Sequence, residues 1–164
     1  AACEASGSMQ VVRATDPTEA DWLRQVRRMA FQALERQGVV HMEDVGVPRS
    51  RVPEMLTRIA RIAGAHELRC ATFGHIGDGN LHPNFVTERG DAAAASRVHA
   101  ASEELYLAAI ELGGTVTAEH GIGLIRRSFL ELQVGTDAVR VMRSIKQALD
   151  PLGILNPGKV LPPA

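Results

Sequence analysis

Two histidines enclose a glycine-rich turn in the stretch Gly74-His75-Ile76-Gly77-Asp78-Gly79-Asn80-Leu81-His82. Glycine, aspartate and asparagine are the residues that best accept a positive φ angle and a sharp reversal of the chain. Apolar segments of strand type flank this turn, at residues 68–75 before it and 79–87 after it. The stretch therefore predicts two neighbouring strands, with one imidazole near the end of each.

Outward from this turn the sequence alternates between strand and helix patterns. Apolar residues recur at helical spacing in several segments, which predicts helices with one buried face. Such an order is typical of an α+β fold, an antiparallel sheet with helices packed on one face. We expect a ferredoxin-like arrangement that is truncated at its N-terminus. The predicted order is strand 9–14, helix 17–37, strand 39–47, helix 52–63, strands 68–75 and 79–87, helix 90–112 and helix 136–150.

Two local patterns refine this outline. Asp16 precedes Pro17 and Glu19, and an N-cap followed by proline and glutamate is typical of a helix start. Within the predicted strand 39–47 we expect Glu43 and Asp44 to lie on the solvent face.

Composition limits the classes of protein to be considered. At 164 residues the chain is long enough for one domain with a real core, and its net charge of −1 gives no electrostatic reason to bind nucleic acid. No run approaches the roughly 20 apolar residues that cross a bilayer. Two cysteines, Cys3 and Cys70, make no disulfide framework, so we expect a cytoplasmic location. The first residue is not methionine, which suggests a piece of a longer polypeptide.

A second dense motif carries a carboxylate and another imidazole, in Gly113-Gly114-Thr115-Val116-Thr117-Ala118-Glu119-His120-Gly121-Ile122-Gly123. Two histidines and one carboxylate form a common catalytic ligand set for zinc, iron(II) or manganese. His75, His82 and Glu119 fit that set if the fold brings the two motifs together. His120 points away from its neighbour Glu119 and is better suited to acid–base chemistry, since its pKa ordinarily lies near neutrality.

Other polar residues have ordinary interpretations. His41, His66 and His99 are each expected to be solvated or hydrogen-bonded in place rather than to bind a ligand. Asp78 and Asn80 are residues that favour turns, and they could also have a functional role.

Three motifs together resemble the C-terminal domain of FAD-linked oxidases. They are the two stretches quoted above and the tail Asp150-Pro151-Leu152-Gly153-Ile154-Leu155-Asn156-Pro157-Gly158-Lys159. The similar group comprises the glycolate oxidase FAD subunit, D-lactate dehydrogenase and D-2-hydroxyglutarate dehydrogenase, within the vanillyl-alcohol oxidase superfamily. The resemblance implies that residues 1–164 form the C-terminal cap and substrate domain of a larger flavoprotein, whose FAD-binding domain is absent from this chain.

The resemblance also implies roles for individual residues. His75, His82 and Glu119 would hold a divalent metal that binds the hydroxyl and carboxylate of a D-2-hydroxy acid. His120 would take the hydroxyl proton while the C2 hydride passes to the flavin. The further implied contacts are Arg27 as a carboxylate clamp (with Arg28 as the alternative), Asn84 as a polar substrate contact, and Asn156 and Lys159 in a tail near the flavin.

Two departures from the family pattern shape the expected activity. Met42 stands where the 2-hydroxyglutarate enzymes carry a lysine, which favours glycolate, lactate or a similar monocarboxylate. No FAD-binding glycine-rich loop is present, so the isolated domain is expected to be inactive. The expected partners are the small hydroxy acid, the FAD-binding domain of the parent chain and, as a further candidate, an electron-transfer subunit. A stand-alone metal-dependent hydrolase and a non-catalytic subunit-interaction module remain as alternatives.

Overall fold

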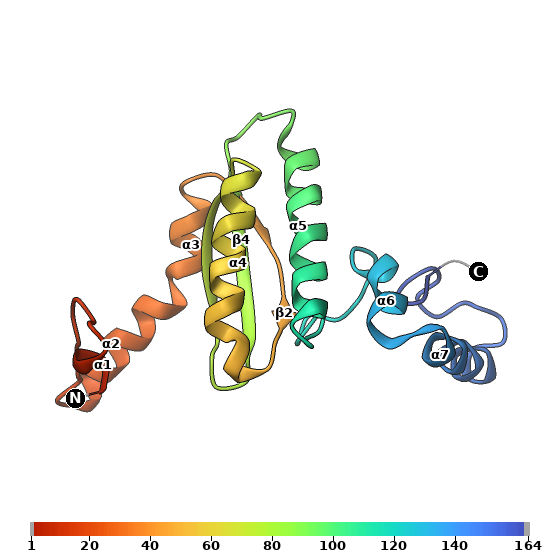
Figure 1. Ribbon diagram of the computed structural model, residues 1–164, viewed down its shortest axis with the longest axis horizontal. Coiled ribbons are helices and arrows are strands. Elements are labelled where there is room, and N and C mark those ends of the chain that lie inside the picture. The colour runs from red at the N-terminus through yellow and green to blue at the C-terminus, as the bar shows by residue number, and fades with distance from the viewer. Residues whose placement is uncertain (1, 163–164) are drawn as a thin grey trace. The chain divides into compact units, whose positions relative to one another are not determined.

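The computed structural model describes residues 2–162 (Figure 1). The chain divides into two compact units, residues 1–38 and residues 39–164, and each is described by itself. In the described part of the chain, the first unit is helical and the second carries all the strands. The helices of the first unit are α1 (Ala2–Ala5), α2 (Pro17–Arg28) and α3 (Ala30–Glu35).

The start of α2 has the predicted cap. The Asp16 carboxylate accepts hydrogen bonds from the backbone N–H groups of Thr18 (2.7 Å) and Glu19 (2.9 Å), and the Glu19 carboxylate accepts one from the N–H of Thr15 (2.7 Å). These bonds occupy N–H groups that a helix N-terminus leaves without partners. The predicted helix 17–37 is not continuous, because the helical pattern is interrupted at Met29.

The predicted strand 9–14 is wrong. None of the strands in the described residues pairs with this segment, and the side chains of Met9, Val11 and Val12 are exposed. A strand needs a neighbour to accept and donate its backbone hydrogen bonds, and apolar composition alone does not supply one.

The second unit is built on a sheet of four antiparallel strands, with β4 in the middle. β3 pairs with one edge of β4, while β1 and β2 share the other edge. β1 and β2 follow one register, since Met42 lies opposite Asn84 and Val45 lies opposite Leu81. The strands are β1 (Val39–Met42), β2 (Val45–Gly46), β3 (Arg69–His75) and β4 (Asn80–Thr87).

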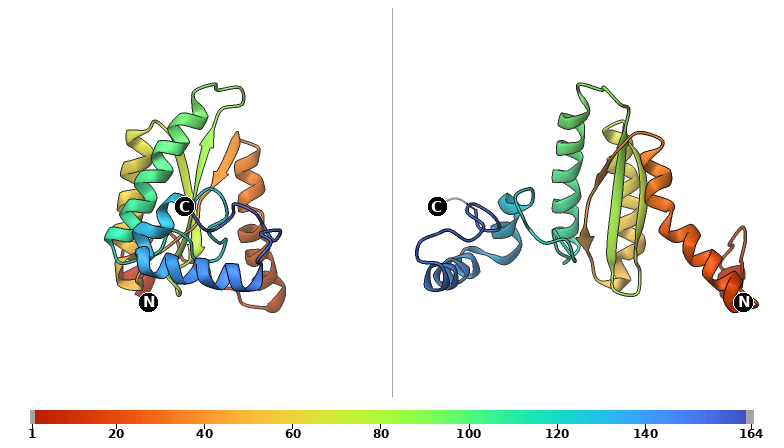
Figure 2. Two further views of the ribbon diagram at one scale, coloured as in Figure 1. Left: turned by 90° about the vertical axis from the view of Figure 1, so that its right-hand side faces the viewer. Right: turned by 180° about the vertical axis from the view of Figure 1, so that it is seen from behind.

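Two long helices, α4 (Val52–Ala65) and α5 (Ala94–Glu111), run side by side next to this sheet (Figures 1 and 2). They share one apolar core with alternate residues of the strands, which confirms the α+β class with helices on one face. The shorter elements are 3₁₀ turns at Arg49–Arg51 and Arg127–Phe129 and the helices α6 (Leu130–Val134) and α7 (Thr136–Leu149). The core includes Val45, Met55, Ile59, Ile62, Leu81, Phe85, Leu105, Tyr106 and Val116.

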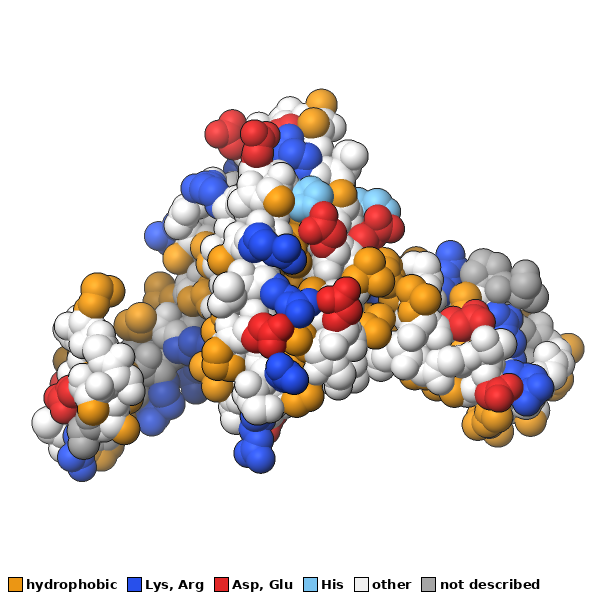
Figure 3. All heavy atoms as spheres, in the orientation of Figure 1, with side chains coloured by type: hydrophobic (Ala, Val, Ile, Leu, Met, Phe, Trp, Pro, Cys, Tyr) orange, Lys and Arg blue, Asp and Glu red, His pale blue; other side chains and the backbone are white. Residues whose placement is uncertain are grey.

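The outer surfaces of α4 and α5 carry mixed charges. Arg58 pairs with Glu54 on its own helix (2.9 Å) and with Glu111 on α5 (2.6 Å). Figure 3 shows blue and red side chains interspersed over this face rather than gathered into patches of one sign. None of the helices in residues 2–162 is long and apolar enough to cross a membrane.

Candidate metal and acid–base site

The turn between β3 and β4 brings the first two histidines together. His75 lies opposite Asn80 in the ladder, and His82 follows two residues later, so both side chains lie on the same face of the sheet. Their rings meet edge to face, with centroids 5.6 Å apart. This is the face opposite the helices, because Leu81 and Phe85, which alternate with His82, belong to the core beneath α4 and α5.

The second motif joins the sheet at β2. Gly46 and Thr115 exchange backbone hydrogen bonds of 3.0 Å and 2.7 Å, which hold the start of the loop beside the strand. Gly114 permits this close approach, since a Cβ there would lie 2.1 Å from the carbonyl oxygen of Gly46. The loop that follows carries Glu119 and His120.

Glu119 and His120 both reach the histidines of the sheet. An oxygen of Glu119, Oε1, lies 2.9 Å from Nε2 of His82 and 3.4 Å from Nε2 of His75. The ring of His120 stacks on that of His82, with centroids 4.9 Å apart and planes 11° from parallel. The four residues expected to meet from two distant motifs therefore form one cluster.

Asp44 lies beneath this cluster, although the sequence predicted it on a solvent face. The continuous register of β1 and β2 places Asp44 opposite His82, and the carboxylate is fully buried. Its Oδ2 accepts four hydrogen bonds from the loop. The donors are the hydroxyl of Thr117 (2.7 Å) and the backbone N–H groups of Ala118 (2.8 Å), Glu119 (3.0 Å) and His120 (2.9 Å).

These bonds decide the charge of Asp44. Burial alone would raise the pKa of its carboxyl group, but the hydrogen bonds from Thr117 and the three backbone groups outweigh it and hold the pKa below its usual range. Burial also lowers the pKa of His82, against the opposing charge of Asp44. The lowered pKa favours the neutral imidazole of His82, the form in which histidine binds metals.

The cluster fits a divalent metal. One ligand atom from each of His75, His82 and Glu119 lies within 4.8 Å of the others. Metal–ligand distances of about 2.0–2.2 Å separate the ligand atoms of a tetrahedral zinc site by about 3.4 Å. The 2.9 Å and 3.4 Å separations from Glu119 are close to that value. His75 and Glu119 are each about half exposed, so the position between them is open to a substrate.

A second group of possible ligands shares one residue with the first. Atoms of Asp44, His82 and His120 also lie within 4.8 Å of one another. In this group one oxygen of Asp44 already accepts four hydrogen bonds, and the carboxylate is closed to solvent. The first group, which faces solvent, is the better candidate for a catalytic metal.

The remaining predicted residues lie elsewhere. Asn84 is fully buried on β4, where its side-chain amide donates to the carbonyl oxygens of His82 (2.7 Å) and Ala71 (3.1 Å). Arg27 lies in the last turn of α2, within the first unit. Asn156 and Lys159 lie in the tail, lining a cavity of about 410 Å³ beside α7.

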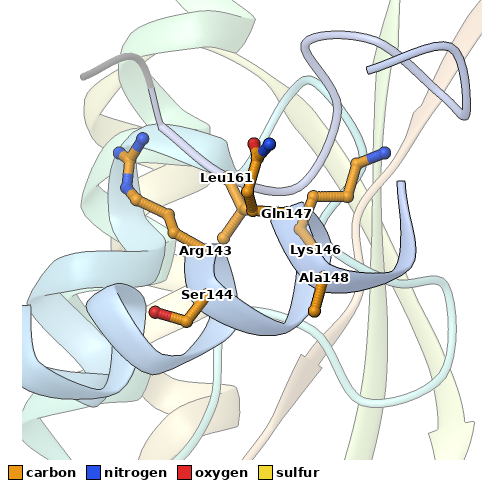
Figure 4. A pocket seen from close by; sticks show the side chains of 6 residues that line it. All are labelled: Arg143, Ser144, Lys146, Gln147, Ala148 and Leu161. Atoms are coloured by element: carbon orange, nitrogen blue, oxygen red, sulfur yellow. The ribbon is translucent and has the colours of Figure 1, made fainter. Parts of the chain in front are cut away.

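A larger cavity, of about 720 Å³, also lies on α7 and contains none of the predicted site residues. Figure 4 shows Arg143, Lys146 and Gln147 projecting around it, together with Ser144, Ala148 and Leu161. It is an open hollow on the helix surface and is separate from the histidine cluster.

Glu43 is the second acid that sequence reasoning placed wrongly. It is buried on the helix-facing side of the sheet, where it accepts hydrogen bonds from Tyr106, from Ser102 (2.7 Å) and from Arg126 (3.2 Å). Arg126 also donates to the carbonyl oxygen of Gly121 (3.2 Å), just after His120. The sequence contained one signal against placing both acids on the solvent face: in a strand, neighbouring residues such as Glu43 and Asp44 point to opposite faces.

Comparisons with known proteins show the family of the chain. A family model described as "FAD linked oxidases, C-terminal domain" matches residues 1–160. The chain belongs to this family. The match covers both histidine motifs, the Glu43–Asp44 pair and the tail.

Relatives of this FAD-linked oxidase domain carry several names. It is 40% identical over 98% of its length to "Glycolate oxidase subunit GlcD" of Bacillus subtilis and 34% identical over 94% to "D-lactate dehydrogenase" of Archaeoglobus fulgidus. It is also 33% identical over 91% to "D-2-hydroxyglutarate dehydrogenase, mitochondrial" of Danio rerio. The chain spans 34%, 34% and 27% of those proteins.

A solved structure shares the fold. It is "4-ethylphenol oxidase from Gulosibacter chungangensis: isoeugenol complex", which matches 75% of this chain and 24% of its own with a TM-score of 0.54 and 24% identity. At that identity the match supports the architecture of the FAD-linked oxidase domain and carries nothing about its substrate.

Proposed function

We propose that this chain supplies the substrate site of an FAD-dependent oxidase or dehydrogenase that converts a D-2-hydroxy acid into the 2-oxo acid. One observation carries the proposal: His75, His82 and Glu119 converge on a single point, with a further imidazole, His120, stacked beside them. The names of the relatives add the hydroxy-acid class, since glycolate and D-lactate both belong to it.

The three converging side chains would hold a divalent metal such as zinc, iron or manganese. When bound, the metal would polarise the hydroxyl oxygen and counter the negative charge that develops there. Bound FAD, held mainly by a domain outside this chain, would supply the oxidant that takes up hydrogen and two electrons from C2. In this proposal, the residues of this chain hold the substrate in position relative to both the metal and the flavin.

His120 is the proposed general base. Its side chain is exposed, and stacking on the buried ring of His82 sets the plane of the imidazole. A ring nitrogen of His120 would accept the hydroxyl proton of the substrate, while His82, on the adjacent strand β4, would serve as a ligand of the proposed metal. Proton transfer to a positioned base is commonly worth a factor of about 10² to 10⁴ in rate.

The substrate is proposed to be a small monocarboxylate. Met42 lies opposite Asn84, on the same face as His82 and Asp44, and it is partly exposed. A thioether at this position offers no positive charge to a second carboxylate. Arg27, Asn84, Asn156 and Lys159 stay as proposed contacts of the substrate and the flavin. The two free cysteines suit the proposed reducing cytoplasm.

Replacement of His120 and His82 tests the two proposed roles separately. In the full-length, flavin-loaded parent protein, His120→Ala should lower the turnover of D-lactate or glycolate about 10²-fold or more, while flavin and metal contents stay unchanged. His82→Ala should lower metal content, measured by elemental analysis. His99→Ala is the control, because that side chain is 75% exposed on α5.

Each result has an outcome that contradicts the proposal. Unaltered turnover in His120→Ala would exclude it as the base, and undiminished metal in His82→Ala would exclude the ligand set. Hydrolysis of esters or amides by the metal-loaded chain, without oxidation of any hydroxy acid, would favour the metal-dependent hydrolase. A flavin-loaded protein without metal or hydroxy-acid dependence would favour the subunit-interaction module.

A further inference from the structure

Asp44 divides its two carboxylate oxygens between two tasks. Oδ2 accepts the four hydrogen bonds from residues 117–120, whereas Oδ1 has no hydrogen-bond partner among the described residues. Nδ1 of His82 lies 3.5 Å from Oδ1. This nitrogen is also buried and has no hydrogen-bond partner in the part of the chain that the structure describes. Two unpaired buried polar atoms therefore face each other.

The other nitrogen of the same ring faces the candidate metal position. Nε2 of His82 lies 2.9 Å from Oε1 of Glu119. A neutral imidazole carries one proton, on either Nδ1 or Nε2, and only the nitrogen without it can bind a metal. Each ring nitrogen therefore faces a carboxylate, but the carboxylate of Glu119 is half exposed to solvent, whereas that of Asp44 is fully buried. A buried acceptor gains more from the ring proton than a solvated one, so Asp44 favours the proton on Nδ1 and leaves the lone pair of Nε2 directed at the metal position.

We propose that Asp44 is a positioning residue that holds His82 in its Nδ1–H form and, through its other oxygen, fixes the backbone of the loop that carries Glu119 and His120. The expected effect of Asp44 on metal affinity rests on the proposed function, in which His82 binds a metal. The 3.5 Å separation is longer than a formed hydrogen bond, and an approach of about 0.5 Å would complete one. A carboxylate behind a metal-binding histidine commonly contributes about 10- to 100-fold to metal affinity.

Both tasks follow from the register of one strand pair. Asp44 directly precedes β2, and the register that β1 and β2 share places it opposite His82 on β4. Residues opposite each other in an antiparallel ladder share a face. Glu43, one residue earlier, lies opposite Pro83 and donates its backbone N–H to that residue's carbonyl oxygen (2.8 Å). This bond keeps the interrupted segment in register, so the backbone holds Asp44 on the same face as His82.

Asp44→Asn is the sharpest test, because the loop dictates how the amide must lie. The position of Oδ2 receives three backbone N–H groups and one hydroxyl, so the amide oxygen must occupy it and the NH₂ group must face His82. An N–H directed at Nδ1 requires a lone pair there, which moves the ring proton to Nε2. The loop keeps its acceptor, while the histidine changes its tautomer.

The tautomer is read directly from the ¹⁵N shifts of the His82 ring in the metal-free 164-residue chain, at about pH 8, where an unperturbed imidazole is neutral. We expect Nδ1–H in the unaltered chain and Nε2–H in Asp44→Asn. The matched control is Thr117→Val, which removes one donor to the other oxygen of Asp44 and should leave the Nδ1–H form unchanged. Zn²⁺ alone is then titrated, with a loss of about 10- to 100-fold in affinity expected for Asp44→Asn.

The outcomes separate this inference from the proposed function. An Nε2–H form in the unaltered chain would overturn the positioning role, whether or not Asp44→Asn folds. The expected tautomers without any Zn²⁺ binding would support the role of Asp44 and count against the metal in the proposed function. Equal Zn²⁺ affinity in the unaltered chain and in a folded Asp44→Asn would overturn the role assigned to Asp44.

Discussion

The two faces of the sheet hold their buried carboxylates with different kinds of donor. On the helix-covered face, Glu43 is held by side chains, from Ser102, Tyr106 and Arg126. On the opposite face, Asp44 is held mainly by backbone N–H groups of a loop. The two acids are neighbours in sequence and nearly equally buried, yet one serves the core and the other serves the histidine cluster.

This difference separates stability from function within one dipeptide. Side-chain donors on a helix hold Glu43 in the apolar core, and its partner Arg126 is also buried, so the pair is an ionic contact between packed elements. Backbone donors instead give Asp44 control over the path of a loop, because each N–H fixes one peptide plane. Substitution of Glu43 should therefore cost mainly stability, and substitution of Asp44 mainly the geometry of the site.

The largest expected effect is that of Glu43→Ala. It leaves the Arg126 guanidinium buried without its carboxylate, and loss of one partner of a buried ion pair commonly costs about 3–5 kcal/mol. The free energy of unfolding, from urea denaturation, should fall by that amount. Glu103→Ala on α5 is the control, because its half-exposed carboxylate makes only a 3.5 Å contact with His99 and should cost less than about 0.5 kcal/mol. Equal stabilities of the two variants would contradict the contrast between the faces.

A second prediction concerns the turn that joins the two strands of the site. Gly79 has a φ of +74°, and a Cβ there would lie 1.9 Å from the carbonyl oxygen of Val47. Gly79→Ala should therefore lower the free energy of unfolding by about 2 kcal/mol or more, through backbone strain and displacement of the neighbouring segment. The experiment is thermal or urea unfolding, paired with Zn²⁺ titration, since the turn also sets His75 against His82.

Gly77→Ala is the matched control in the same turn. No atom lies within 4 Å of a Cβ built at Gly77, and its φ is not in the left-handed region. Its stability should stay within about 0.5 kcal/mol of the unaltered chain. Similar losses for the two alanines would show that the turn as a whole, rather than the contact of Gly79 with Val47, supports the strands.

The sequence predicted those parts of the site that depend on local chemistry. The glycine-rich turn and the cap at Asp16 are short-range patterns, and both are present in the structure. The cluster of His75, His82, Glu119 and His120 followed from residue types and family resemblance, and the structure brings these residues together. Their chemical roles stay predictions, because geometry alone tests no reaction.

What the sequence could not provide was register. Glu43 and Asp44 read as a polar interruption on a wet face, because charged residues are seldom buried without partners. Their partners lie more than 50 residues away, on α5 and in the loop after Gly114, and only the pairing of β1 and β2 with β4 shows which face each acid takes. The absent strand at 9–14 has the same cause, since a strand depends on a neighbour elsewhere in the chain.

The smallest expected effect comes from a carboxylate in the tail that uses the same kind of donor as Asp44. Asp150, at the end of α7, accepts hydrogen bonds from the backbone N–H groups of Ile154 (3.0 Å) and Leu155 (2.9 Å) and pairs with Lys146. The hydrogen bond from the Lys146 side chain holds the pKa of Asp150 below its ordinary value of 3.8, and the two backbone N–H groups add to this effect. Burial acts in the opposite direction but is outweighed. Above that value the charged carboxylate holds the tail.

The pH dependence of the tail follows from the sign of that shift. Since the folded chain favours the charged form, the contribution of Asp150 is complete well above pH 3.8 and is lost as the pH falls through the lowered pKa. Asp150→Asn should speed amide hydrogen exchange at Ile154 and Leu155 near neutral pH and make little difference at the lowest pH. Asp137→Asn, at an exposed position on the same helix, should leave exchange in the tail unchanged. Equal protection of both amides in all three chains at every pH would mean that apolar contacts hold the tail. A carboxylate that accepts several backbone N–H groups would then fix the path of a loop only where it is fully buried, as Asp44 is.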